Sequence, residues 1–155
     1  NIQGDEPMID PDVIDKVAVL LDKNEMSTAA APIKQPEDLE NPNVVKVVVN
    51  SLGKALYFSR HAIPYVRDVA NSSISENITS FPFLKHIGIY GYQKDTLLRF
   101  VNHPISSLEK SEKLEQLRAL ENDISISVAV VNYDSIGVDT PEDLIILQEH
   151  LKTES

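Results

Sequence analysis

The chain has 155 residues, which is enough for one domain with a hydrophobic core. It is 42% hydrophobic and 25% charged, as in an ordinary globular protein, and its net charge of -10 argues against a nucleic-acid-binding surface. Because there is no cysteine, disulfides and cysteine-ligated zinc are excluded, and no apolar run approaches the roughly 20 residues that span a bilayer.

The start of the chain is unusual, because it opens at Asn1 without an initiator methionine. Ile2 is the apolar residue before a polar turn, and we expect it to end a parallel strand whose beginning is missing. The next predicted element is a helix over 11–21, where apolar residues recur at helical spacing after Asp10 as N-cap and Pro11 at the first helical position. We therefore expect a fragment whose N-terminal part is missing.

The remaining elements alternate between strands and helices. Residues 27–33 are predicted to be extended, 44–49 and 55–59 to form a hairpin, 69–80 to form a polar surface loop, 84–92 and 124–131 to form strands, and 94–101, 111–120 and 141–151 to form helices. This order predicts an α/β fold, with a mixed, mostly parallel sheet flanked by helices, in a single domain over 1–155.

Two short acidic segments are candidates for a metal site. Asp5 lies in the segment 3–7, directly after the predicted strand end at Ile2, and parallel α/β sheets place ligands at such strand ends. Asp139 follows Gly137 before the helix predicted over 141–151. Carboxylates there suit magnesium, which takes one or two of them together with substrate phosphates. The alternatives are an acidic turn at Asp5 and a helix cap at Asp139.

Histidine and tyrosine mark a second candidate site. His86 and Tyr90 are four residues apart in the predicted strand 84–92, so both side chains lie on the same face. Simple packing of the two rings is the alternative. Neither a nucleophilic triad nor a glycine-rich phosphate loop is present. The run 108–118 is predicted to be an amphipathic helix whose glutamates are solvated.

Taken together, these segments resemble one family, the CMP-3-deoxy-manno-octulosonate synthetases, and the segments that carry the resemblance are 3–7, 41–46, 55–60, 86–92, 114–118 and 137–144. The resemblance implies a nucleotide-diphospho-sugar transferase-like fold and transfer of a cytidylyl group from CTP to 3-deoxy-manno-octulosonate, for lipopolysaccharide biosynthesis. In that reaction the anomeric hydroxyl attacks the α-phosphorus and pyrophosphate leaves.

The resemblance also implies residue roles. Asp5 and Asp139 hold Mg²⁺, and Arg60 pairs with the sugar carboxylate. Gln3 lies beside the nucleotide and the sugar, and the sugar hydroxyls are bound by His86, Tyr90, Glu115 and Gln116. A cytoplasmic homodimer is expected, with the hairpin and the segment around Pro64 as its contact, and no nucleic acid or membrane as partner.

The family's arginine- and lysine-rich phosphate-binding segment and its cytosine-binding segment have no counterpart in the chain. We therefore expect the chain to be the C-terminal portion of the domain, carrying the sugar and metal side, and to be inactive alone. The competing hypotheses are a sialic-acid cytidylyltransferase and a non-catalytic binding or dimerisation module.

Overall fold

The structure, a computed structural model, describes residues 1–4, 9–69 and 74–133. The strands are β1 (Met26–Pro32), β2 (Lys46–Val49), β3 (Ala55–Ser59), β4 (Leu84–Tyr92) and β5 (Ile126–Val130). The helices are α1 (Pro11–Leu20), α2 (Pro36–Glu40), the 3-10 helix η1 (Arg67–Val69), α3 (Ile74–Ser80), α4 (Lys94–Asn102), α5 (Ser107–Glu112) and α6 (Gln116–Glu121). None of the helices in these ranges is long and apolar enough to cross a membrane. Asp5, Asp139 and the helix predicted over 141–151 lie outside the described residues.

The described strands form one mixed sheet in the order β3-β2-β4-β1-β5. β1 and β5 are parallel, whereas the pairs β1–β4, β2–β3 and β2–β4 are antiparallel. The mixed sheet and the hairpin are confirmed, but the expectation of a mostly parallel sheet is wrong for these strands. The reason is that β4 runs antiparallel to both of its neighbours, β1 and β2, and that β2 and β3 form an antiparallel hairpin.

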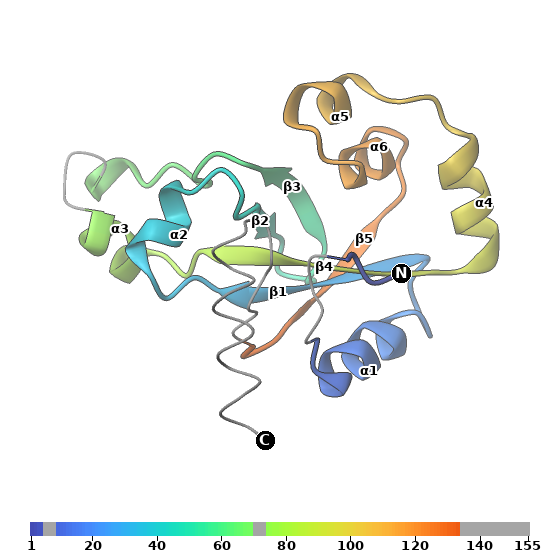
Figure 1. Cartoon of the computed structure of the whole chain (residues 1–155), viewed down its shortest axis with the longest axis horizontal. Helices are drawn as coiled ribbons and strands as arrows, with labels where there is room; N and C mark the ends of the chain where they lie inside the picture. Colours follow the sequence, from blue (N-terminus) through green and yellow to red (C-terminus); the bar gives the residue numbers. More distant parts are fainter. Residues whose placement is uncertain (5–8, 70–73, 134–155) are drawn as a thin grey trace.

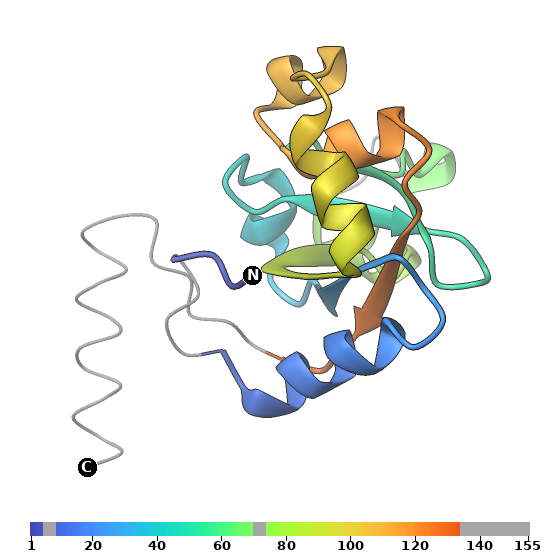
Figure 2. The ribbon, with the colours of Figure 1, turned by 90° about the vertical axis from the view of Figure 1, so that its right-hand side faces the viewer.

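Helices cover both faces of this sheet, with α1 on one face and α4, α5 and α6 on the other (Figures 1 and 2). β1 explains the arrangement, because its side chains alternate between two cores. Met26 and Ala30 pack in the core with Phe100 of α4 and Leu117 of α6. The odd-numbered residues, such as Ala29, pack with Val13 and Val17 of α1. A strand that is covered on both faces exposes neither side to solvent, and every residue from Met26 to Ala31 is buried.

The helix α1 begins where the sequence predicts it. The Asp10 side chain accepts a hydrogen bond of 2.8 Å from the backbone N–H of Asp12, and proline occupies the first helical turn. The prediction of a surface loop over 69–80 is wrong, because α3 occupies Ile74–Ser80. Ile78 packs against a small core of Ile33, Leu39 and Phe83, and this tertiary contact outweighs the polar composition of the segment.

Candidate active site

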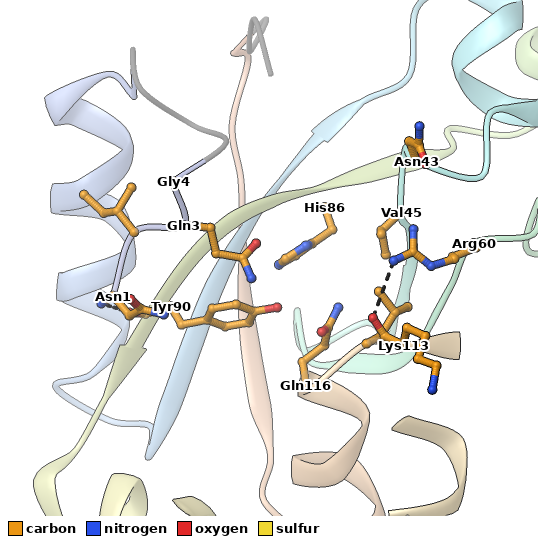
Figure 3. A pocket seen from close by; sticks show the side chains of 12 residues that line it. Asn1, Gln3, Gly4, Asn43, Val45, Arg60, His86, Tyr90, Lys113 and Gln116 are labelled. Atoms are coloured by element: carbon orange, nitrogen blue, oxygen red, sulfur yellow. Dashed lines mark hydrogen bonds between the residues drawn. The ribbon is translucent and has the colours of Figure 1, made fainter. Parts of the chain in front are cut away.

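A cavity of about 640 Å³ opens beside β4, between the N-terminal segment and the junction of α5 with α6 (Figure 3). It is lined by Asn1, Ile2, Gln3, Gly4, Asn43, Val45, Arg60, His86, Tyr90, Lys113, Leu114 and Gln116. Five of the predicted site residues therefore share one cavity, namely Gln3, Arg60, His86, Tyr90 and Gln116.

Two separate backbone segments pair with the same edge of β4, one after the other, and the cavity lies where the first segment ends and the second begins. Residues 1–3 pair with the second half of β4, where the Gln3 N–H donates to the Gly88 carbonyl at 2.8 Å. The first half pairs with β2 and the residue before it, since the His86 N–H donates to the Val45 carbonyl at 2.8 Å. Both segments run antiparallel to β4 and follow one another along it, and the residues on either side of the gap, Gln3 and Val45, both line the cavity. The expectation that Ile2 ends a parallel strand is wrong, because Ile2 forms an isolated bridge with Ile89 of β4 and that pairing is antiparallel.

Gly88 provides the space in which the Gln3 side chain lies. A Cβ atom added at Gly88 would meet Gln3 Oε1 at 2.5 Å and Gln3 Cβ at 3.1 Å. Any side chain at this position would therefore displace the Gln3 amide. His86 and Tyr90 flank Gly88 on the same face, as the alternation predicts, with ring centroids 5.2 Å apart. The three side chains form one continuous wall of the cavity (Figure 3).

The hydrogen bonds around His86 fix its tautomer. The Thr28 hydroxyl has a single proton, which it donates to the Ile89 carbonyl at 2.6 Å. The same oxygen lies 2.9 Å from His86 Nε2, so it can only accept there, and Nε2 must carry the proton. Burial lowers the pKa of His86 from 6.5 to about 3, which keeps the ring neutral. Nδ1 is then an acceptor, with no protein donor among the described residues, and is suited to a ligand hydroxyl.

We predict that His86 stays in the Nε2–H tautomer from about pH 5 to about pH 8, a range in which an exposed histidine would titrate. Nitrogen chemical shifts of the imidazole in a labelled sample are the measurement. Because the pKa is lower in the folded state, the unfolded chain takes up the proton first, and stability falls as the pH drops below about 6.5. A midpoint near pH 6, or protonation at Nδ1, would contradict the assignment.

Arg60 reaches the cavity from the end of β3 and joins three segments of backbone. Its Nε donates to the Glu112 carbonyl at 2.8 Å and Nη1 to the Pro42 carbonyl at 2.8 Å. Its Nη2 donates to the Lys113 carbonyl at 3.4 Å (Figure 3). Two of the five guanidinium N–H groups have no partner among the described residues. No carboxylate of the described chain lies within ion-pair distance of Arg60, so the cation is available to an anionic ligand.

The junction between α5 and α6 presents Gln116 to the cavity. The predicted single helix over 111–120 is wrong, because the chain ends α5 at Glu112 and adopts a left-handed conformation at Lys113 (φ 54). Gln116 then begins α6 as a buried residue that lines the cavity. Glu115 is not among the lining residues. Its charge instead acts on Tyr92, whose pKa is raised by burial and by this carboxylate.

The glutamates of α5 are not the solvated side chains that the amphipathic pattern predicts. Glu109 forms an ion pair with Arg118, in which Oε1 lies 2.6 Å from Nη2 and the two side chains are 12% and 16% exposed. This pair lowers the pKa of Glu109. Glu112 accepts from the Ser59 hydroxyl at 2.7 Å and from the Arg60 N–H at 2.9 Å. The helix is therefore tied to β3, which brings Lys113 and Gln116 beside Arg60.

Lys46 is the residue near the site that the sequence pattern does not reveal. Its side chain is fully buried, and Nζ donates to the carbonyls of Asn41 at 2.9 Å and Val44 at 2.6 Å. Burial and the neighbouring charge of Arg60 lower the pKa of Lys46 from 10.5 to about 8. The sequence around Lys46 does not predict that its side chain is buried. The carbonyl groups that accept its hydrogen bonds belong to a turn earlier in the chain.

The comparisons with known proteins identify the family. A family model described as cytidylyltransferase matches residues 1–126. The chain belongs to the cytidylyltransferase family. It is 49% identical to the 3-deoxy-manno-octulosonate cytidylyltransferase of Thermodesulfovibrio yellowstonii, over 100% of this chain and 60% of that protein. Identity to the same-named protein of Syntrophotalea carbinolica is 46%, over 98% of this chain and 62% of the relative.

A solved structure agrees with this assignment. CMP:2-keto-3-deoxy-manno-octonic acid synthetase complexed with CTP matches with a TM-score of 0.86 and 36% sequence identity, over 100% of this chain and 61% of that chain. The predicted resemblance and fold class are confirmed. This cytidylyltransferase chain spans about 60% of the length of the curated relatives it matches.

The carboxylates predicted to bind magnesium, Asp5 and Asp139, lie outside the described residues. Within residues 1–4, 9–69 and 74–133, no group of three or more histidine, aspartate or glutamate side chains could hold a metal ion. The cavity itself is positive and polar, with Arg60, Lys113, Gln3 and Gln116 on its walls. These groups suit an anionic, hydroxyl-rich ligand.

Proposed function

We propose that this cytidylyltransferase chain provides the sugar-acid side of an active site that transfers a cytidylyl group from CTP to 3-deoxy-manno-octulosonate. The observation that carries the proposal is the composition of one cavity. The cation of Arg60, the neutral acceptor of His86, and the amides of Gln3 and Gln116 converge on it. A sugar acid offers one carboxylate and several hydroxyls, which match this set in charge and hydrogen-bonding type.

In the proposed complex, Arg60 pairs with the sugar carboxylate through its two remaining N–H groups, since a guanidinium suits a planar anion. His86 Nδ1 accepts from a sugar hydroxyl. The amides of Gln3 and Gln116 and the hydroxyl of Tyr90 complete the binding of the sugar. Glu115 is half-buried at the start of α6, and we propose that it also binds a sugar hydroxyl, next to these residues. The anomeric hydroxyl then attacks the α-phosphorus of CTP, and the bond to the leaving pyrophosphate breaks.

Magnesium is part of the proposal, with Asp5 and Asp139 as its protein ligands. Support comes from the chemistry of the donors, since this hard cation is held by one or two carboxylates together with substrate phosphates. Asp5 follows directly on Gly4, which lines the cavity. A bound magnesium ion would neutralise charge on the triphosphate and lower the pKa of the attacking hydroxyl.

The experiment that tests the function is pyrophosphate release by the complete gene product. It is supplied with CTP and magnesium, and with either 3-deoxy-manno-octulosonate or sialic acid. Release with the octulosonate alone is the expected result, and the same assay without magnesium tests the metal. Release with sialic acid alone would assign the protein to another sugar acid. No release with either sugar, from a folded protein, would favour a binding module.

We further propose that the protein is a cytoplasmic homodimer, which associates through the β2–β3 hairpin and the segment around Pro64. Large apolar side chains are exposed on both of these segments, where Leu52 is 80%, Leu56 60% and Tyr65 77% accessible. Burying such side chains against a second copy would remove apolar surface from water.

Replacing Leu56 and Tyr65 with aspartate is expected to convert a dimer to a monomer in sedimentation velocity, because two charges would be buried at the contact. Val19→Asp is the matched control, since Val19 is 67% exposed on α1, away from this surface. A monomeric wild type, or a dimer that survives both substitutions, would contradict the proposal.

A further inference from the structure

Two cations hold one short loop at the wall of the cavity. The loop comprises residues 41–44 and connects α2 to β2, with Asn43 among the cavity-lining residues. Lys46 lies on β2 next to this loop, and Arg60 lies close to it because Lys46 pairs with Ser59, the last residue of β3 and the residue before Arg60. The loop is therefore bordered by two positive charges, one on the sheet and one at its edge.

The carbonyls of the loop face these cations. Asn41 and Val44 accept from the Lys46 ammonium, and Pro42 accepts from the Arg60 guanidinium. A turn completes the arrangement, since the Val44 N–H donates to the Asn41 carbonyl at 3.2 Å and the Asn43 N–H to the Asn41 side chain at 2.9 Å. With three carbonyls directed at cations, the loop has one preferred arrangement, and that arrangement places Asn43 at the cavity.

The charges around Lys46 leave this wall positive. No carboxylate of the described residues lies within ion-pair distance of Lys46 or the Arg60 guanidinium, and carbonyl oxygens take that place. The carboxylates that act on Lys46 from farther away are Glu112 and Asp38. Glu112 already accepts from Ser59 and from the Arg60 backbone, and Asp38 is bound to Lys85 at 3.3 Å. An anion in the cavity would be attracted by a charge pair that the protein leaves largely uncompensated.

We propose that Lys46 is a positioning residue for the sugar acid, which holds loop 41–44 against the cavity and, with Arg60, makes this wall selective for an anionic ligand. Lys46 does not line the cavity, so it acts through the loop and through its charge. This inference rests on the proposed function. It adds a determinant of substrate binding that lies behind the cavity wall.

The test is steady-state kinetics of Lys46→Met and Lys46→Gln in the complete protein. Methionine removes both the charge and the donors, whereas glutamine keeps donors for the carbonyls without the charge. We expect KM for the sugar acid to rise about tenfold or more in Lys46→Met and to rise less in Lys46→Gln, as for the loss of one charged hydrogen-bonded group. KM for CTP should change less than about twofold, because CTP does not contact this wall in the proposal.

A purely structural role predicts a different result. If the substitution only unfolds part of the sample, the remaining folded enzyme has an unchanged KM and the apparent kcat falls. Lys85→Met is the matched control, since Lys85 lies opposite Lys46 on β4 and is 15% exposed, but it binds Asp38 and not the loop carbonyls. We expect Lys85→Met to leave KM for the sugar acid unchanged. An unchanged KM in Lys46→Met, with an active wild type, would overturn the inference.

The wild type supplies a measurement that does not depend on folded variants. Because the pKa of Lys46 is lowered to about 8, its charge is lost within an accessible range, and KM for the sugar acid should rise from about pH 7 to about pH 9. A flat KM over this range would overturn the inference. No turnover by the wild type at any pH would instead reject the proposed function.

Discussion

Replacing Arg60 with methionine is expected to lower kcat/KM for the sugar acid by about 100-fold, since a charged hydrogen-bonded pair contributes about 1.5–3 kcal/mol. The substitution removes the cation that we pair with the substrate carboxylate. It also frees the carbonyls of Glu112, Pro42 and Lys113, which the guanidinium now joins. The measurement is pyrophosphate release by the complete protein over a range of sugar-acid concentrations.

Arg60→Lys separates geometry from charge. An ammonium at this position keeps the positive charge but cannot donate in the three directions that Nε, Nη1 and Nη2 take. We expect Arg60→Lys to lose nearly as much activity as Arg60→Met. Arg67→Met is the control, because the Arg67 side chain is 89% exposed and, within the part of the chain that the structure describes, its ion-pair partner is Asp68, whose side chain is 87% exposed. Near-normal kinetics in Arg60→Lys would show that a point charge is sufficient and that the three-way contact is not required.

The family resemblance implied Gln3, Arg60 and Gln116 as site residues, and all three line the same cavity. His86 and Tyr90 were predicted from local periodicity, and they face the same way because a strand alternates. The fold class followed from the order of strands and helices. These features depend on a few consecutive residues, so one sequence contains the information.

The features that the sequence did not predict depend on contacts between distant segments. The break between α5 and α6 falls at Lys113, whose positive φ is unusual for a residue other than glycine, aspartate or asparagine. Lys46 is buried because a turn earlier in the chain offers it two carbonyls. The antiparallel course of β4 depends on its choice of neighbours, and that choice is not encoded in its own alternation.

Substituting Gly88 with alanine is expected to reduce kcat/KM for the sugar acid about tenfold, the loss expected for one hydrogen bond to the substrate. The new Cβ would meet Gln3 Oε1 at 2.5 Å, so the Gln3 amide must leave its place between His86 and Tyr90. Since the displaced group is the end of a flexible side chain, we expect the free energy of unfolding to fall by less than about 1 kcal/mol. Pyrophosphate release and chemical denaturation of the same sample measure the two effects.

Gly91→Ala is the matched control on the same strand, because its Cβ would point to the opposite face of β4 and meet Ser27 Oγ at 2.5 Å and Leu21 Cδ1 at 2.9 Å. This is overpacking of a core, and we expect it to cost about 1–3 kcal/mol of stability while KM stays unchanged. A double-mutant cycle identifies the mechanism at Gly88. If the alanine acts through Gln3, then Gly88→Ala causes no further loss in a Gln3→Ala background. Additive losses would mean that Gly88 contributes to the site independently of Gln3, through the backbone of β4 itself.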